Sequence, residues 1–155
     1  MYRYRLFPEY GLLFIKFSDP YVGAAGDNAV LEICRQLSIE DRYSIRALVF
    51  DMTKVTSFDL TETDRARIAH FERTLLEIFT HPGKDAVSHI SSVRNFSLLP
   101  ESPEAAISWK ERQTRLRRAT RHTEVSDWSP NLQEILATLK LENVMVTFLS
   151  ALYND

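Results

Sequence analysis

The stretch that decides the fold runs from Arg46 to Asp64 and reads RALVFDMTKVTSFDLTETD. It contains an uninterrupted apolar run, Ala47 to Phe50, which is followed directly by Asp51. A short apolar run is typical of a central strand that is covered on both faces. We therefore expect a strand over Ile45 to Asp51 that reaches solvent at Asp51. Because ligands and partners of open α/β sheets bind at the carboxyl ends of the strands, the polar turn after Asp51 is the first candidate for a functional surface.

Strand and helix patterns alternate on both sides of this stretch. The aromatic and aliphatic runs Tyr2 to Phe7 and Leu12 to Phe17 predict an antiparallel hairpin at the N-terminus. Helical spacing of apolar residues predicts helices over Gly23 to Ile39, Thr61 to Thr80 and Pro103 to Arg118, and a further helix begins with Ser129 as cap and Pro130 at its first position. Period-two alternation predicts strands over Asp85 to Val93 and His122 to Ser126.

This order of elements predicts an α/β fold: a mixed, largely parallel sheet of four to five strands with crossover helices and an N-terminal antiparallel hairpin. A chain of 155 residues fits one domain, here 1–155, with an apolar C-terminal extension at 142–155. Within that extension, Val144 to Tyr153 fits a helix or a strand, and we favour a helix.

The composition is that of an ordinary globular protein. A net charge of -2 gives no general attraction to nucleic acid or to an anionic membrane. No apolar run approaches the ~20 residues that span a bilayer, and the N-terminal residues lack a signal-peptide pattern, so we expect no membrane insertion. The single cysteine, Cys34, excludes an internal disulfide and favours a cytoplasmic location. Cys34 falls on an apolar helix stripe, which predicts inert core packing.

The turn after the central strand carries six candidate recognition residues, namely Asp51, Thr53, Lys54, Asp59, Thr61 and Glu62. A capping box is the simpler interpretation of Asp59 and Glu62, because each side chain can accept a hydrogen bond from a free amide at the start of a helix. Recognition of a partner is compatible with the same geometry. The sequence has no glycine-rich phosphate loop, nucleophile elbow or metal-ligand cluster near the turn, so we expect a protein that is not an enzyme and needs no cofactor or metal.

The order of elements and this turn together resemble the STAS family, the small α/β domains typified by anti-sigma-factor antagonists. The resemblance depends on Leu48, Val49, Phe50, Asp51, Thr53, Val55, Phe58 and Asp59. Where the family pattern continues with two serines and a glycine, this chain has Leu60, Thr61 and Glu62. The resemblance implies a regulatory, protein-binding module in which Thr61 matches a serine that a partner kinase phosphorylates. Glu62 places a negative charge beside any phosphate on Thr61, which would make the switch a degenerate one.

The predicted helix over Pro103 to Arg118 is locally basic. Its candidate face consists of Lys110, Arg112, Arg115 and Arg118. Nucleic acid would need such a face and, for single strands, exposed aromatic side chains on which bases stack, whereas the spacing of Trp109 predicts burial. A solvated helix face is therefore the simpler interpretation, and we do not expect nucleic-acid binding. Among the histidines, His89 and His122 are the pair that neighbouring strands could bring together.

Two functions from different classes follow from these observations. The first is a bacterial regulatory module that binds a protein partner through the recognition turn. The second is a carrier of a small molecule or lipid, with a pocket between the sheet and the helices. An enzyme that uses Asp51, Asp59 or His89 is a third reading, since α/β sheets host unrelated chemistries. The apolar residues Val144, Phe148 and Leu152 also predict self-association as a homodimer.

Overall fold

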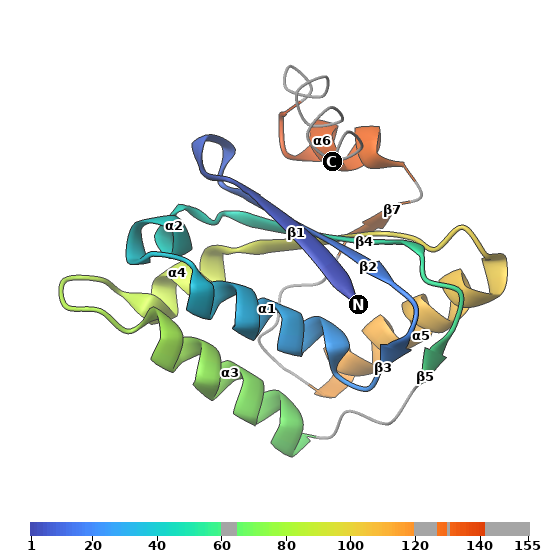
Figure 1. Cartoon of the computed structure of the whole chain (residues 1–155), viewed down its shortest axis with the longest axis horizontal. Coiled ribbons are helices and arrows are strands. Elements are labelled where there is room, and N and C mark those ends of the chain that lie inside the picture. The colour runs from blue at the N-terminus through green and yellow to red at the C-terminus, as the bar shows by residue number, and fades with distance from the viewer. Residues whose placement is uncertain (60–64, 120–126, 130, 142–155) are drawn as a thin grey trace.

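Five strands form the main sheet, in the spatial order β1–β2–β4–β6–β7 (Figure 1). The computed structural model describes residues 1–59, 65–119, 127–129 and 131–141, with the backbone alone at 59, 65–68, 115–119 and 127–129. The strands are β1 (Tyr2–Phe7), β2 (Leu12–Ser18), β4 (Ala47–Lys54), β6 (Arg94–Leu98) and β7 (Asp127–Ser129). β1 pairs with β2 antiparallel, and the other neighbours are parallel. The predicted α/β class and the mixed, largely parallel sheet are therefore confirmed.

Helices cover both faces of this sheet. The connections between parallel strands contain α1 (Ala25–Gln36), α2 (Ile39–Ser44), α3 (Arg65–Phe79), α4 (Ala86–Ser92) and α5 (Pro103–Ala119). Figure 1 shows α1, α3 and α5 on one face of the sheet and α6 (Leu132–Thr138) on the other. The 3-10 helix η1 (Pro8–Tyr10) joins β1 to β2, and two short strands, β3 (Tyr21–Val22) and β5 (Phe58–Asp59), form a separate parallel pair.

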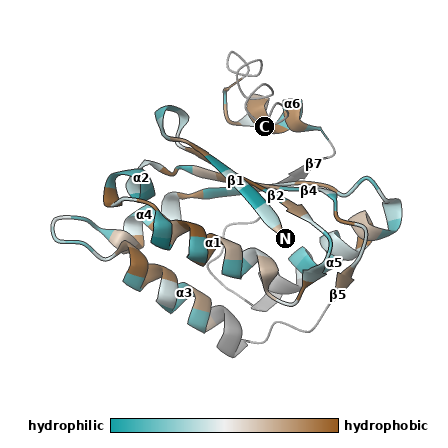
Figure 2. Ribbon diagram, viewed as in Figure 1, coloured by the Kyte–Doolittle hydropathy of each residue, from teal (hydrophilic) through white to brown (hydrophobic). Residues whose placement is uncertain are grey.

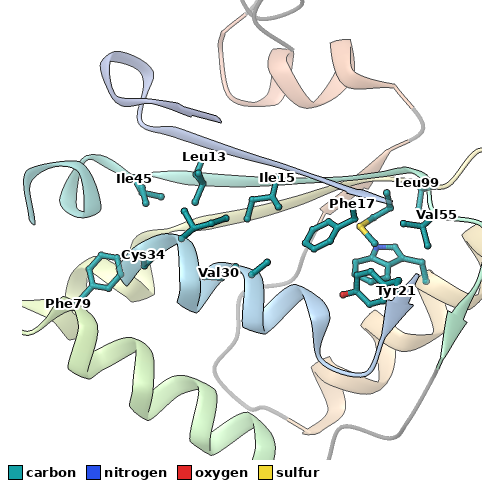
Figure 3. Close-up of a cluster of buried hydrophobic side chains, with 14 residues drawn as sticks. Leu13, Ile15, Phe17, Tyr21, Val30, Cys34, Ile45, Val55, Phe79 and Leu99 are labelled. Carbon is teal, nitrogen blue, oxygen red and sulfur yellow. The ribbon is translucent and has the colours of Figure 1, made fainter. Parts of the chain in front are cut away.

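The apolar run of β2 supplies both layers of the core. Because successive side chains of a strand point to opposite faces, Leu13, Ile15 and Phe17 belong to the cluster on the α1 face, whereas Leu12 and Phe14 belong to the cluster on the α6 face. Figure 3 shows Leu13, Ile15 and Phe17 between the sheet and the α1 layer. A strand with two buried faces has no polar alternation, which explains its continuous apolar sequence.

The helices bury one stripe each. Ala29, Val30, Ile33 and Cys34 of α1 recur at helical spacing and are buried against the sheet. Figure 2 shows hydrophobic and hydrophilic residues alternating along α1 and α3. On the other face, Ile135 and Leu136 of α6 contribute to the second cluster. No helix in the described ranges is long and apolar enough to cross a membrane.

One predicted element is of the wrong type and one helix was not predicted, and in both places a side-chain cap begins a helix. The predicted strand over Asp85 to Val93 is helix α4, followed by β6. Asp85 caps α4, since its carboxylate accepts from Ser88 N at 3.1 Å and from Ser88 Oγ at 2.9 Å. The helix predicted over Gly23 to Ile39 is confirmed as α1, but α2 was not predicted; Ser38 caps α2 by accepting from Asp41 N at 3.2 Å.

The start of the last described helix also differs from its prediction. Asn131, and not Ser129, is its cap: the Asn131 side chain accepts from Gln133 N at 2.8 Å. Ser129 is the last residue of β7 and pairs with Leu98 of β6. The predicted strand over His122 to Ser126 and the apolar segment over Val144 to Tyr153 lie outside the residues that the structure describes.

Candidate functional site

Asp51 is buried, so the expectation that it reaches solvent is wrong. Its side chain is 1% exposed, because β4 continues past it to Lys54. The Asp51 Oδ1 atom accepts hydrogen bonds from Thr53 N at 2.9 Å and from Thr53 Oγ1 at 2.5 Å. A carboxylate that bonds to the backbone two residues later fixes the local chain direction. Asp51 therefore holds the backbone at the end of β4, and its side chain is not exposed to a partner.

Two loops and the end of strand β4 meet a third loop at the carboxyl edge of the parallel strands, and hydrogen bonds join these segments. The loop after β4 contacts the loop after β2, since Thr56 N and Thr56 Oγ1 donate to the Asp19 carboxylate at 3.1 Å and 2.5 Å. The loop after β6 contacts the end of strand β4 itself, because Glu101 N donates to Thr53 O at 3.2 Å. We call the polar residues of these loops and of the end of β4 the carboxyl-edge surface: Asp19, Thr53, Lys54, Thr56, Ser57 and Glu101.

The carboxyl-edge surface carries both signs of charge. Lys54 Nζ lies 3.2 Å from Glu101 Oε1, and the two side chains are 57% and 67% exposed. An ion pair this exposed contributes only about 0–1 kcal/mol to stability. Its ammonium and carboxylate groups therefore remain available to a partner at little energetic cost.

The contact between Thr56 and Asp19 predicts a pH dependence at this edge. The hydrogen bonds from Thr56 hold the pKa of Asp19 below its ordinary value of 3.8. A lowered pKa in the folded state means that the contact is present above 3.8 and is lost as the pH falls through the folded value. An NMR titration should therefore show the Thr56 amide changing only below pH 3.8. In Thr56→Val, which lacks the hydroxyl donor, the midpoint should rise toward 3.8; an unchanged midpoint would contradict the contact.

Four aromatic side chains pack beneath this edge. We call Phe17, Tyr21, Phe58 and Trp109 the aromatic cluster. The Tyr21 ring lies edge-on to Phe58 at 5.1 Å and to Trp109 at 5.8 Å, and Phe58 stacks on Trp109 at 5.3 Å between ring centroids. Such geometries are the favoured ones for aromatic pairs. The predicted burial of Trp109 is confirmed, and the cluster anchors the β3–β5 pair to α5.

Arg112 does not belong to a solvated basic face, contrary to expectation. Its side chain is 7% exposed, Nη2 donates to Gly23 O at 2.6 Å, and Cζ lies 5.3 Å from the centre of the Tyr21 ring. The physical reason is helical spacing, since Arg112 follows the buried Trp109 by one turn on α5. Lys110 is exposed as expected. The side chains of Arg115 and Arg118 lie outside the described residues.

The structure brings together part of the predicted recognition turn. Thr53 and Lys54 lie on the carboxyl-edge surface, and Asp59 is the last residue of β5. Thr61 and Glu62 lie outside the described residues. The sequence reasoning missed Asp19 and Glu101, although each follows the end of an apolar strand, which is a signal that could have found them.

The remaining candidates are separate from this edge. His89 lies on helix α4 and not on a strand, where it stacks on Phe79 at 5.7 Å and packs on Tyr43 at 4.8 Å. Burial is the largest cause that lowers the pKa of His89. His122 lies outside the described ranges. The predicted core packing of Cys34 is confirmed, since burial raises the pKa of its thiol to about 11.

The site gives no sign of a metal centre within the part of the chain that is described: no three His, Cys, Asp or Glu side chains are grouped there so that they could hold an ion. In comparisons with known proteins, no family model, no curated protein and no solved structure matches the chain. The likeness to the STAS family therefore stays a prediction.

Proposed function

We propose that this protein is a non-enzymatic bacterial regulatory module of STAS-like fold that binds a protein partner through the carboxyl-edge surface. The observation that carries the proposal is the hydrogen bonding at this edge, which joins the loops after β2 and β4 through Thr56 and Asp19 and joins the loop after β6 to the end of β4 through Glu101 and Thr53. Loops held on a rigid scaffold are the usual location of binding residues. A surface that is already ordered loses less conformational entropy when a partner binds.

The chemistry of this surface favours a polar partner surface. Lys54 and Glu101 offer opposite charges within one ion pair, and Thr56 and Ser57 are exposed. A partner with a complementary pair of charges would gain orientation from both groups. Phosphorylation of Thr61 would regulate this binding. Mass spectrometry of the protein isolated from its own cells shows whether Thr61 carries a phosphate.

Substitution of Ser57 tests the proposal against a matched control. Ser57→Arg adds a long charged side chain to the carboxyl-edge surface, whereas Ser91→Arg adds the same side chain to exposed α4, away from the carboxyl-edge loops. Affinity capture from extracts of the native cells should recover a partner with the wild-type protein and with Ser91→Arg. We expect Ser57→Arg to weaken capture at least about tenfold, since a misplaced interface charge costs several kcal/mol. Equal capture by both variants would refute the proposed surface.

The carrier alternative has one observation in its favour. The Nε1 atom of Trp109 and the Nη1 atom of Arg112 are buried and have no hydrogen-bond partner in the described structure. Native mass spectrometry of the purified protein separates the two functions. A retained small molecule or lipid would favour the carrier, and an empty protein that still captures its partner would favour the regulatory module.

A further inference from the structure

Arg112 is a buried cation with an unused donor. Its Nη2 atom donates to the neutral carbonyl of Gly23, while Nη1 has no hydrogen-bond partner in the described part of the chain. Burying a charged group is costly unless it is paired and its donors are satisfied. An unsatisfied guanidinium nitrogen inside a protein therefore needs an explanation.

The unused donor lies at the start of helix α1. Gly23, which accepts from Arg112 Nη2, comes two residues before the first residue of that helix, Ala25. The N-cap residue, Ala24, has no side-chain oxygen and makes no side-chain cap. First-turn N–H groups have no acceptor within their helix, and the helix dipole makes this end positive. The Ala24 cap therefore satisfies none of the first-turn N–H groups, and of these Tyr21 accepts from the Gly26 amide.

The Tyr21 hydroxyl lies at the same turn as the Arg112 guanidinium. Its hydroxyl oxygen accepts from Gly26 N at 3.0 Å, so the hydroxyl hydrogen points elsewhere as a donor. The close approach requires a glycine, because a Cβ at position 26 would lie 2.6 Å from Tyr21 Oη. The Tyr21 ring also packs against Arg112. Side chains of β3 and α5 and the backbone of α1 therefore meet at one turn.

We propose that this turn binds a phosphate-type oxyanion, held by the Arg112 guanidinium, the Tyr21 hydroxyl and the Ala25 amide at the start of α1. A planar guanidinium fork matches the oxygens of a phosphate, and a helix N-terminus supplies further N–H donors. The site is independent of the partner surface proposed above, so either can fail without the other. The ligand is inorganic phosphate or the phosphate group of a small molecule or lipid.

Asp27 sets the strength of this site. It lies in the first turn of α1. Burial is the largest cause that raises the pKa of Tyr21, and the Asp27 charge adds to it against the opposing charge of Arg112. An ionised carboxylate here competes with the bound anion for the same positive groups. Removal of the Asp27 charge should therefore tighten anion binding, which is the opposite of what loss of a purely structural residue would do.

Titration with inorganic phosphate, at constant ionic strength set with sodium chloride, tests the proposal by NMR. We expect saturable shifts of the Ala25 and Gly26 amides. Arg112→Gln should weaken binding at least about tenfold, because a hydrogen bond to a charged group is lost. The matched control, Lys110→Gln, removes an exposed cation from the same helix and should change the affinity by less than about twofold. Asp27→Asn should bind phosphate more tightly than the wild type.

Two further arms identify the source of the phosphate. Equal affinity for inorganic phosphate and glycerol phosphate points to a free or small phosphate, whereas stronger binding of short-chain phosphatidic acid points to a lipid headgroup. If the NMR spectrum shows that Arg112→Gln does not fold, Arg112→Lys replaces it, since it keeps the charge but lacks the planar fork. Non-saturable shifts, equal losses in the variants of Arg112 and Lys110, or no tightening in Asp27→Asn would overturn the proposal.

Discussion

Replacement of Phe14 by alanine is expected to lower the free energy of unfolding by about 3–5 kcal/mol. Phe14 is 1% exposed and lies on the α6 face of β2, in one cluster with Val49, Phe96 and Leu136. The loss combines the transfer of a large apolar side chain with the cavity that remains. Urea denaturation followed by circular dichroism measures it.

The control for Phe14 is an aromatic residue on the neighbouring strand. Tyr4 is 39% exposed on β1, and its hydroxyl makes one long hydrogen bond to Gln36 at 3.4 Å. Tyr4→Ala should cost about 1 kcal/mol or less, as is usual for partly exposed positions. If Phe14→Ala cost no more than Tyr4→Ala, the face of the sheet beneath α6 would not be a packed core.

Replacement of Gly11 by alanine is the second change with a large expected effect. Gly11 has φ +65°, and a Cβ there would lie 2.9 Å from the Ser44 carbonyl oxygen and 2.9 Å from Arg46 Cγ. The left-handed backbone costs about 1–2 kcal/mol, and overpacking adds about 1–3 kcal/mol. The Gly11 carbonyl also accepts from Arg46 N and Ala47 N, so displacement of this turn would loosen the hairpin from the start of β4.

Gly83 offers a matched control for the steric part of that cost. It has φ +80°, but a Cβ there would meet nothing within 4 Å. Gly83→Ala should therefore lower the free energy of unfolding by the backbone term alone, about 1–2 kcal/mol. Thermal or urea denaturation of both variants gives the difference. Equal losses would show that the close approach of Gly11 to Ser44 and Arg46 is not a constraint on the fold.

Much of the architecture could be predicted because the spacing of apolar residues along the sequence differs between strands and helices. The hairpin of β1 and β2, the buried strand β4 and helix α5 follow from apolar patterns that burial imposes on a strand or a helix. Helix α4 could not be recognised this way, since a segment this short shows a similar pattern as a strand and as a helix. Its identity depends on the cap that Asp85 provides.

The candidate site was only partly predictable, because burial of polar groups depends on the tertiary structure. Asp51 ends an apolar run, which is the signature of an exposed strand end, yet the chain continues β4 and buries it. Arg112 lies among other basic residues in the sequence, but it packs over the ring of Tyr21, a residue that is distant from it in the sequence. The bond between Thr56 and Asp19 likewise joins loops whose proximity follows from strand order.

Hydrogen exchange of the free protein and of its captured complex, read by mass spectrometry, locates the surface that the partner covers. We expect slower exchange on binding in the segments that carry or adjoin the carboxyl-edge surface, at residues 19–22, 53–59 and 99–102. Peptides around Gly11 and α4, away from the carboxyl-edge loops, should exchange unchanged. Protection confined to those control peptides, with none at the carboxyl-edge surface, would contradict the proposed binding surface.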